Sequence, residues 1–229
     1  MTIGGLQKLS LADFPGRLAA IIFTRGCNFR CPYCHNPELV DPRRYGPCIP
    51  DHEVLCFLKS RQGQLEGVVV TGGEPTVQGD LHQMLQKIRA LGFAVKLDTN
   101  GSFPDRVRTL VQEGLLDYVA IDIKASGLAY ESAVGVPVDR EAIRKSVELV
   151  VEAGVQHELR LTVVNPATAL EQVKGIAEMA RGCGVFFLQA FQPTKVLDSR
   201  LLSLPRPSVE ELERLRRALS DAGLPAVLR

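Results

Sequence analysis

The chain has 229 residues, of which 45% are hydrophobic, and it carries 27 basic against 26 acidic side chains. With a mean hydropathy of +0.05, it is long enough to bury a full core as one α/β domain. The balanced charge, without a long run of either sign, argues against a dedicated nucleic-acid or membrane-surface binder. No apolar stretch approaches the roughly 18 residues that a membrane helix needs.

Short apolar segments and helical periodicity alternate along most of the chain. Residues 1–18 are predicted to be irregular, with a turn at Asp13–Gly16. Buried strands are predicted at Ala19–Thr24, Val68–Val70, Phe93–Leu97, Tyr118–Ile123, Glu158–Val164 and Val185–Leu188. Helices are predicted from Asp51, over Asp80–Leu91 and Asp105–Glu113, after the cap Asp139, over Ala169–Arg181, and from the capping box of Ser208 and Glu211 to Ala222.

Strands separated by helices pair in parallel through right-handed crossovers, so six β/α units predict an open, partial (β/α)6 barrel with its helices outside. We expect a single domain over residues 1–229, with a core at about 17–193 and a C-terminal extension, 194–229, that contains one helix. Polar motifs follow the C-terminal ends of five strands, where such folds build their active sites. They are residues 27–34, 71–74, 98–100, 122–124 and 189–192.

Cys27, Cys31 and Cys34 form a C-x3-C-x2-C loop directly after the first predicted buried strand. Three thiolates hold three corners of an iron–sulfur cube, whereas the usual cluster has four cysteines. One iron would therefore remain open to a small molecule that chelates it. An open iron indicates catalysis rather than simple electron transfer.

Other interpretations of these residues are weaker. Cys31 and Cys34 alone make a C-x-x-C redox motif, which leaves Cys27 unexplained, and with His35 they spell a haem-attachment sequence. Haem attachment requires export, and the first residues show no basic segment followed by an apolar one. A zinc site with His35 as fourth ligand stays open, although such sites usually have a second ligand pair at a distance.

The remaining cysteines, Cys48, Cys56 and Cys183, are irregularly spaced. Each is predicted to be a small buried hydrophobic residue. Six cysteines, three of them clustered as metal ligands, indicate a reducing compartment rather than a disulfide framework. We therefore expect a cytoplasmic protein.

The cysteine spacing, with Tyr33 just before the third cysteine, resembles the signature loop of the radical S-adenosylmethionine (radical SAM) enzymes. Asp13–Gly16 and Cys31–Pro37 resemble the branch that activates glycyl-radical enzymes. The resemblance spans about Ile3 to Pro193. It implies a partial barrel, a [4Fe–4S] cluster held by the three cysteines, and S-adenosylmethionine bound to the open iron.

The resemblance also implies roles for the polar motifs. Gly72 and Gly73 would let the backbone approach the ligand, and Glu74 would orient this loop or accept a hydrogen bond from the ligand amine. Asp98 and Asn100, with Thr99 between them, resemble the D-T-N-G segment of the branch, in which the aspartate meets the amine. A monovalent cation is implied beside Asp98, Thr99 and Asp122.

Lys124 corresponds to the lysine that meets the ligand carboxylate in this branch. Two interpretations of Arg160 stay open: a second cation for that carboxylate, or an ion pair with Glu158 inside the barrel. Gln189 and Gln192 are expected near the adenine or the substrate mouth. The four histidines share no spacing and are expected in surface or loop roles.

The function implied is reductive cleavage of S-adenosylmethionine to a 5′-deoxyadenosyl radical, which takes a hydrogen atom from a glycine of a partner enzyme. The expected partner is anaerobic ribonucleoside-triphosphate reductase, and the expected electron donor is a flavodoxin or ferredoxin. A radical SAM enzyme acting on a small molecule such as a pterin is the alternative. A non-catalytic iron–sulfur or zinc module is disfavoured by the missing fourth cysteine and the five polar motifs.

Overall fold

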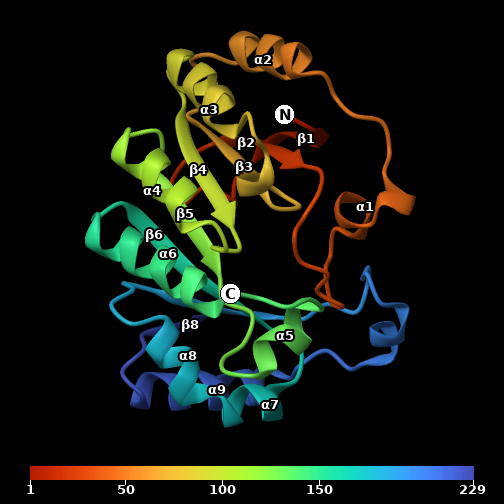
Figure 1. Cartoon of the computed structure of the whole chain (residues 1–229), viewed down its shortest axis with the longest axis vertical. Helices are drawn as coiled ribbons and strands as arrows, with labels where there is room; N and C mark the ends of the chain where they lie inside the picture. Colours follow the sequence, from red (N-terminus) through yellow and green to blue (C-terminus); the bar gives the residue numbers. More distant parts are fainter.

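The computed structural model describes all 229 residues, and one eight-stranded sheet organises them (Figure 1). The strands pair in sequence order: β1 Ile3–Ser10, β2 Ala19–Thr24, β3 Gly67–Gly72, β4 Ala94–Thr99, β5 Tyr118–Asp122, β6 Gln156–Val163, β7 Phe186–Ala190 and β8 Ala226–Leu228. β1 is antiparallel to β2, and all later neighbours are parallel. β1 and β8 are the two edges, so the curved sheet forms an open, partial barrel.

The six predicted strands are confirmed as β2 to β7, and two further strands were missed. The prediction of an irregular first segment is wrong, because residues 3–10 form β1 by pairing with β2 in a hairpin, with Ile3 opposite Thr24 and Ser10 opposite Ala19. β8 has only three residues and adds to β7. Both segments form strands because they pair with a neighbouring strand, and neither was predicted from its own sequence.

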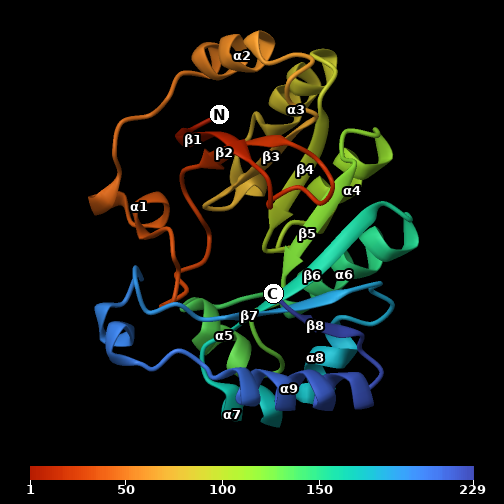
Figure 2. The ribbon, with the colours of Figure 1, turned by 180° about the vertical axis from the view of Figure 1, so that it is seen from behind.

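All helices except α1 (Pro37–Val40), which lies to one side of the sheet, cover its outer, convex face (Figures 1 and 2). The others are α2 Asp51–Ser60, α3 Leu81–Ala90, α4 Pro104–Gln112, α5 Ala129–Val134, α6 Arg140–Glu152, α7 Pro166–Glu171, α8 Val173–Met179 and α9 Val209–Asp221. The caps at Asp139 and at Ser208 with Glu211 are confirmed. The prediction of a single helix over Ala169–Arg181 is wrong. α7 begins earlier, after the cap Asn165, and the helix is interrupted at Gln172 before α8 begins.

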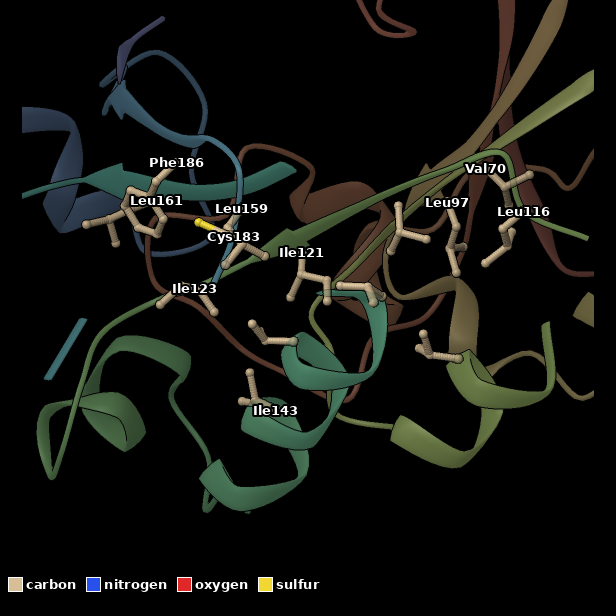
Figure 3. Packing of buried hydrophobic residues seen from close by; sticks show 14 of the residues in the cluster. Val70, Leu97, Leu116, Ile121, Ile123, Ile143, Leu159, Leu161, Cys183 and Phe186 are labelled. Carbon is tan, nitrogen blue, oxygen red and sulfur yellow. The ribbon is translucent and has the colours of Figure 1, made fainter. Parts of the chain in front are cut away.

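Alternate strand residues face two different cores. In β2, Ala20 and Ile22 join the large cluster between sheet and helices, while Ala19 and Ile21 point into the barrel. Figure 3 shows the large cluster where residues such as Leu97 and Ile121 meet the helices. Inside the barrel, the turn at Asp13–Gly16 delivers the buried ring of Phe14, which meets Tyr118 edge-on.

The chain after β7 returns to the cysteine loop, and Figure 1 shows this blue segment below α1, at the lower end of the loop that follows β2. The amide of Asp198 donates to the carbonyl of Pro32 at 2.9 Å, and Lys195 pairs with Glu38 at 2.6 Å. His35 Nε2 lies 3.1 Å from the carbonyl oxygen of Gln192. Residues 192–204 therefore brace the loop that carries the cysteines. None of the helices is long and apolar enough to cross a membrane.

Candidate active site

A cavity of about 410 Å³ lies inside the barrel at the C-terminal ends of the strands. All but one of the site residues predicted from the sequence line it: Cys27, Cys31, Tyr33, Cys34, Gly72, Gly73, Glu74, Asp98, Thr99, Asn100, Asp122, Lys124, Arg160 and Gln189. The parallel strands end at one edge of the sheet, so motifs far apart in sequence meet there. Gln192 does not line the cavity.

The cysteine loop, residues 27–34, follows β2 and presents three free thiols to this cavity. Burial raises the pKa of Cys27 to about 12 and that of Cys31 to about 11, and it also raises the pKa of Cys34. The buried Glu74 carboxylate adds to the shift at Cys27. Because iron is bound by thiolates, assembly of a cluster here must release protons.

Gly72 and Gly73 are required by the neighbouring backbone. A Cβ at Gly73 would lie 2.1 Å from the carbonyl oxygen of Gly26, and one at Gly72 would lie 2.5 Å from the amide nitrogen of Thr24. Gly72 also has a positive φ of 111°, which favours glycine. The two glycines let the end of β3 and the loop after it pack against the segment that leads into the cysteine loop. They were predicted to let the backbone approach a ligand, and this contact within the protein was not predicted.

Glu74 is buried and ties two loops together. Its Oε1 accepts from the amide and hydroxyl of Thr76 and, at 2.6 Å, from the hydroxyl of Thr99. Its Oε2 accepts from the amide of Asn100 at 2.7 Å. Burial raises the pKa of this carboxyl, although the four donors oppose that rise. Of its two predicted roles, this geometry favours orienting the loop.

Four charged side chains alternate along the cavity wall. Arg160 donates from Nε to Asp122 Oδ1 at 2.8 Å and from Nη1 to Asp98 Oδ2 at 3.0 Å. Lys124 Nζ donates to the other oxygen of Asp122 at 3.1 Å. Burial disfavours the charged form of Asp122, but Arg160 and Lys124 outweigh it and hold the pKa of that carboxyl well below its ordinary value. Asp122 is therefore a carboxylate held by two cations.

Deeper in the barrel, Glu158 connects this row to further buried charges. Its Oε1 lies 3.6 Å from Arg160 Nη1, 3.5 Å from Lys96 Nζ and 3.1 Å from Arg229 Nη1. Its Oε2 accepts from the hydroxyl of Tyr118 at 3.1 Å. Arg160 thus makes the predicted internal ion pair, but its shorter contacts are to the two aspartates.

Two buried polar atoms of the cavity residues have no hydrogen-bond partner: Asp98 Oδ1 and the hydroxyl of Tyr33. Lys96 Nζ lies 3.3 Å from Asp98 Oδ1 without forming a hydrogen bond. Buried polar atoms are normally satisfied, so an unpaired carboxylate oxygen in a cavity suits a donor from a ligand, such as an ammonium group.

The donor set also fits an iron–sulfur cluster. No three His, Cys, Asp or Glu side chains gather around one point as they would for a single metal ion. The three thiols of the cysteine loop instead line one shared cavity and are not tied up in disulfides. Three free thiols that line one cavity supply three of the ligands that such a cluster needs.

The structure corrects some expectations and adds residues that the sequence did not indicate. Cys48 and Cys56 are exposed, so their prediction as buried hydrophobic residues is wrong, whereas Cys183 is buried as predicted. Asp13 and His35 also line the cavity. Asp13 belongs to the predicted turn at Asp13–Gly16, but no sequence pattern around it indicated that this turn reaches the interior of the barrel.

Comparison with known proteins identifies the family. The model of the radical SAM superfamily matches residues 21–180, which is more than half of the chain, and the protein belongs to this superfamily. The resemblance to the radical SAM enzymes is thereby confirmed. Membership makes the protein an oxidoreductase of this type and implies a [4Fe–4S] cluster and S-adenosylmethionine.

Two relatives match over most of their length. The Methanocaldococcus jannaschii protein named "Putative glycyl-radical enzyme activating enzyme MJ1227" is 33% identical over 219 residues, covering 93% of this chain and 89% of the relative. The 7-carboxy-7-deazaguanine synthase of Thermococcus kodakarensis is 28% identical over 225 residues, covering 90% and 87%. The resemblance to the activating branch is supported by the first of these relatives.

Solved structures support the fold. Streptococcus suis SuiB bound to S-adenosylmethionine matches with a TM-score of 0.67 and 16% identity, over 91% of this chain and 49% of that one. A domain of the pyruvate-formate lyase-activating enzyme from Bacteroides vulgatus matches with a TM-score of 0.54 and 21% identity, over 72% of this chain and 99% of that one. At these identities the comparisons show the radical SAM fold alone.

Proposed function

We propose that this protein cleaves S-adenosylmethionine reductively and generates a glycyl radical on a partner enzyme, anaerobic ribonucleoside-triphosphate reductase. The observation that carries the proposal is the cavity itself, which is lined by three free thiols and by Asp98, whose Oδ1 accepts no hydrogen bond. The relative at 33% identity, matched over 93% of this chain, supports the activating role.

The thiols and the charged side chains of the cavity would then bind different parts of the cofactors. Cys27, Cys31 and Cys34 would hold the cluster, and the amine and carboxylate of S-adenosylmethionine would bind its remaining open iron. The amine donates to Asp98 Oδ1, the unpaired acceptor. The carboxylate meets Lys124, whose ammonium has three donors, only one of which is used by Asp122.

Arg160 acts in this scheme as a support for both aspartates. Its two short bonds fix the Asp98 and Asp122 carboxylates, so that neither must reorganise when the ligand arrives. Tyr33 and Gln189 border the remaining space and are assigned to the nucleoside portion. A monovalent cation is not part of the proposal, because both oxygens of Asp122 already accept from cationic side chains.

When bound, the cluster supplies one electron that breaks the C5′–S bond of S-adenosylmethionine, giving methionine and a 5′-deoxyadenosyl radical that takes a hydrogen atom from glycine. The protein contributes orientation and exclusion of water. Apolar side chains of Phe29, Val40, Ile21 and Phe23 line the cavity alongside the charged row. The electron comes from a reduced flavodoxin or ferredoxin, in the reducing cytoplasm.

A second candidate function is the conversion of a small molecule. The similarity to a 7-carboxy-7-deazaguanine synthase over 90% of this chain favours it. The charged interior, with Asp98, Arg160 and Glu158, would suit a polar metabolite as well as a peptide backbone. The two candidates differ in the origin of the hydrogen atom, which an experiment can follow.

The test is anaerobic incubation of the reduced protein with S-adenosylmethionine and the reductase, followed by electron paramagnetic resonance. We expect a doublet signal that loses its splitting when the glycine of the partner is α-deuterated. Cys31→Ala serves as the control that lacks a complete cluster and should give no signal. If 5′-deoxyadenosine forms with a small metabolite while no glycyl radical appears, the second candidate replaces the first.

A further inference from the structure

Three polar side chains from two loops close a ring of hydrogen bonds beside the cavity. Asn100 Nδ2 donates to Asn28 Oδ1 at 2.9 Å, and Asn28 Nδ2 donates to Ser102 Oγ at 2.9 Å. Ser102 Oγ donates to Asn100 Oδ1 at 2.6 Å and completes the ring. All three bonds run in one direction, so each polarises the next. Asn28 lies 72 and 74 positions from its two partners in the sequence.

The ring joins the two loops that the ligand must bridge. Asn28 directly follows Cys27, and Asn100 lies two residues after Asp98, whose Oδ1 is unpaired. Asn100 lines the cavity, but its Oδ1 accepts from both the amide and the hydroxyl of Ser102. Its side chain is therefore occupied by partners within the protein.

We propose that this ring, the Asn28 clip, sets the separation between the cysteine loop and the Asp98 carboxylate. Asn28, Asn100 and Ser102 are then positioning residues: they allow one ligand molecule to reach the open iron and Asp98 at the same time. The inference rests on the proposed binding of S-adenosylmethionine. A preformed separation spares the ligand the cost of ordering two loops, and errors of about 1 Å in such a site reduce rates by about a hundredfold.

The clip completes a triangle of three loops. The loop after β3 is tied to the segment that leads into the cysteine loop: the amide of Gly73 donates to Thr24, the last residue of β2, and that of Glu74 donates to Gly26, both at 2.8 Å. The Glu74 carboxylate ties the loop after β3 to the loop after β4 through Asn100. Only the clip joins the cysteine loop directly to the loop after β4. Its removal leaves the other two sides in place, so the fold and iron binding should persist.

The test uses the variants Asn28→Ala and Ser102→Ala, both reconstituted anaerobically with iron and sulfide. Three quantities are measured: iron per chain, the Kd of S-adenosylmethionine, and the change that the ligand produces in the electron paramagnetic resonance of the reduced cluster. We expect unchanged iron content, a Kd raised about tenfold in Asn28→Ala and about threefold in Ser102→Ala, and an altered spectral response.

Two further variants separate positioning from general stability. Ser208→Ala removes a helix-capping hydrogen bond far along the chain, at α9, and should leave the Kd unchanged despite a similar loss of stability. The double variant Asn28→Ala with Ser102→Ala should bind no worse than Asn28→Ala alone, because both changes open the same ring.

Unchanged affinity in both single variants would overturn the inference. Loss of iron in Asn28→Ala, together with normal affinity in Ser102→Ala, would also overturn it, because Asn28 would then serve the cysteine loop alone. Failure of the proposed function looks different: the wild-type protein would hold its cluster but bind no S-adenosylmethionine.

Discussion

Replacing Gly73 by alanine tests how the wall of the cavity is built. The new Cβ would lie 2.1 Å from the carbonyl oxygen of Gly26 and 2.7 Å from its carbonyl carbon. Both are backbone atoms, so no change of rotamer relieves the contact. One of the two loops must move by about 1.3 Å before the shorter distance reaches 3.4 Å, the lower limit of ordinary contact.

That movement also breaks the hydrogen bonds from Gly73 to Thr24 and from Glu74 to Gly26, both 2.8 Å long. Overpacking costs about 1–3 kcal/mol, and each of the two bonds contributes about 1 kcal/mol. We therefore expect Gly73→Ala to destabilise the protein by about 3–5 kcal/mol. In a chain of this size 1 kcal/mol corresponds to about 2–4 °C, so the melting temperature should fall by roughly 6–20 °C.

The assay is thermal unfolding of the cluster-free protein followed by circular dichroism, together with iron content after reconstitution. Gly79→Ala is the matched control, because a Cβ there meets nothing within 4 Å and the backbone φ is not positive. It should be neutral or stabilising by about 0.4–1 kcal/mol. A melting temperature of Gly73→Ala within about 2 °C of wild type would refute the packing argument.

Three other predictions concern the charged and thiol groups. Replacing each cysteine of the cysteine loop by alanine should abolish iron binding, whereas the same change at the other three cysteines should not; loss of iron with Cys48→Ala would contradict the three-thiol site. Lys124→Ala should weaken S-adenosylmethionine binding about tenfold to a few hundredfold with iron retained, as measured by equilibrium titration. Since the native pKa of Asp122 is depressed, its contribution to stability is complete above about pH 4 and is lost as the pH falls towards the native pKa. Denaturant unfolding should therefore show that wild type loses more stability between about pH 4 and pH 2 than Asp122→Asn does. If the free energy of unfolding falls equally with pH in both proteins, the ion pairs of Asp122 are disproved.

Much of the molecule could be predicted from local patterns. The six strands β2 to β7 are short apolar segments bounded by turns, and their alternation with amphipathic helices allows few topologies other than a parallel barrel. Parallel strands bring their C-terminal ends to one edge. Motifs as distant as Cys27 and Gln189 were therefore predicted to share a site, and both line the cavity.

The sequence could not predict features that depend on contacts between distant residues. β1 and β8 are strands because a neighbour pairs with them, and the helix predicted over Ala169–Arg181 breaks at Gln172, whose side chain accepts from the amide of Ser126 at 2.7 Å. The exposure of Cys48 and Cys56 likewise follows from where the chain runs, since a cysteine carries no pattern of its own.

The same division holds within the site. Residue types and spacing determined that thiols, carboxylates and cations would meet at the barrel rim. Only the tertiary structure decided which of them are already paired: Glu74 and Asn100 are occupied by neighbouring loops, while Asp98 Oδ1 accepts no hydrogen bond and has only the Lys96 ammonium 3.3 Å away. A difference of a few tenths of an ångström in the donor–acceptor distance decides whether two groups form a hydrogen bond. In this site the two groups can be 74 positions apart in the sequence, and no local sequence pattern encodes such a distance.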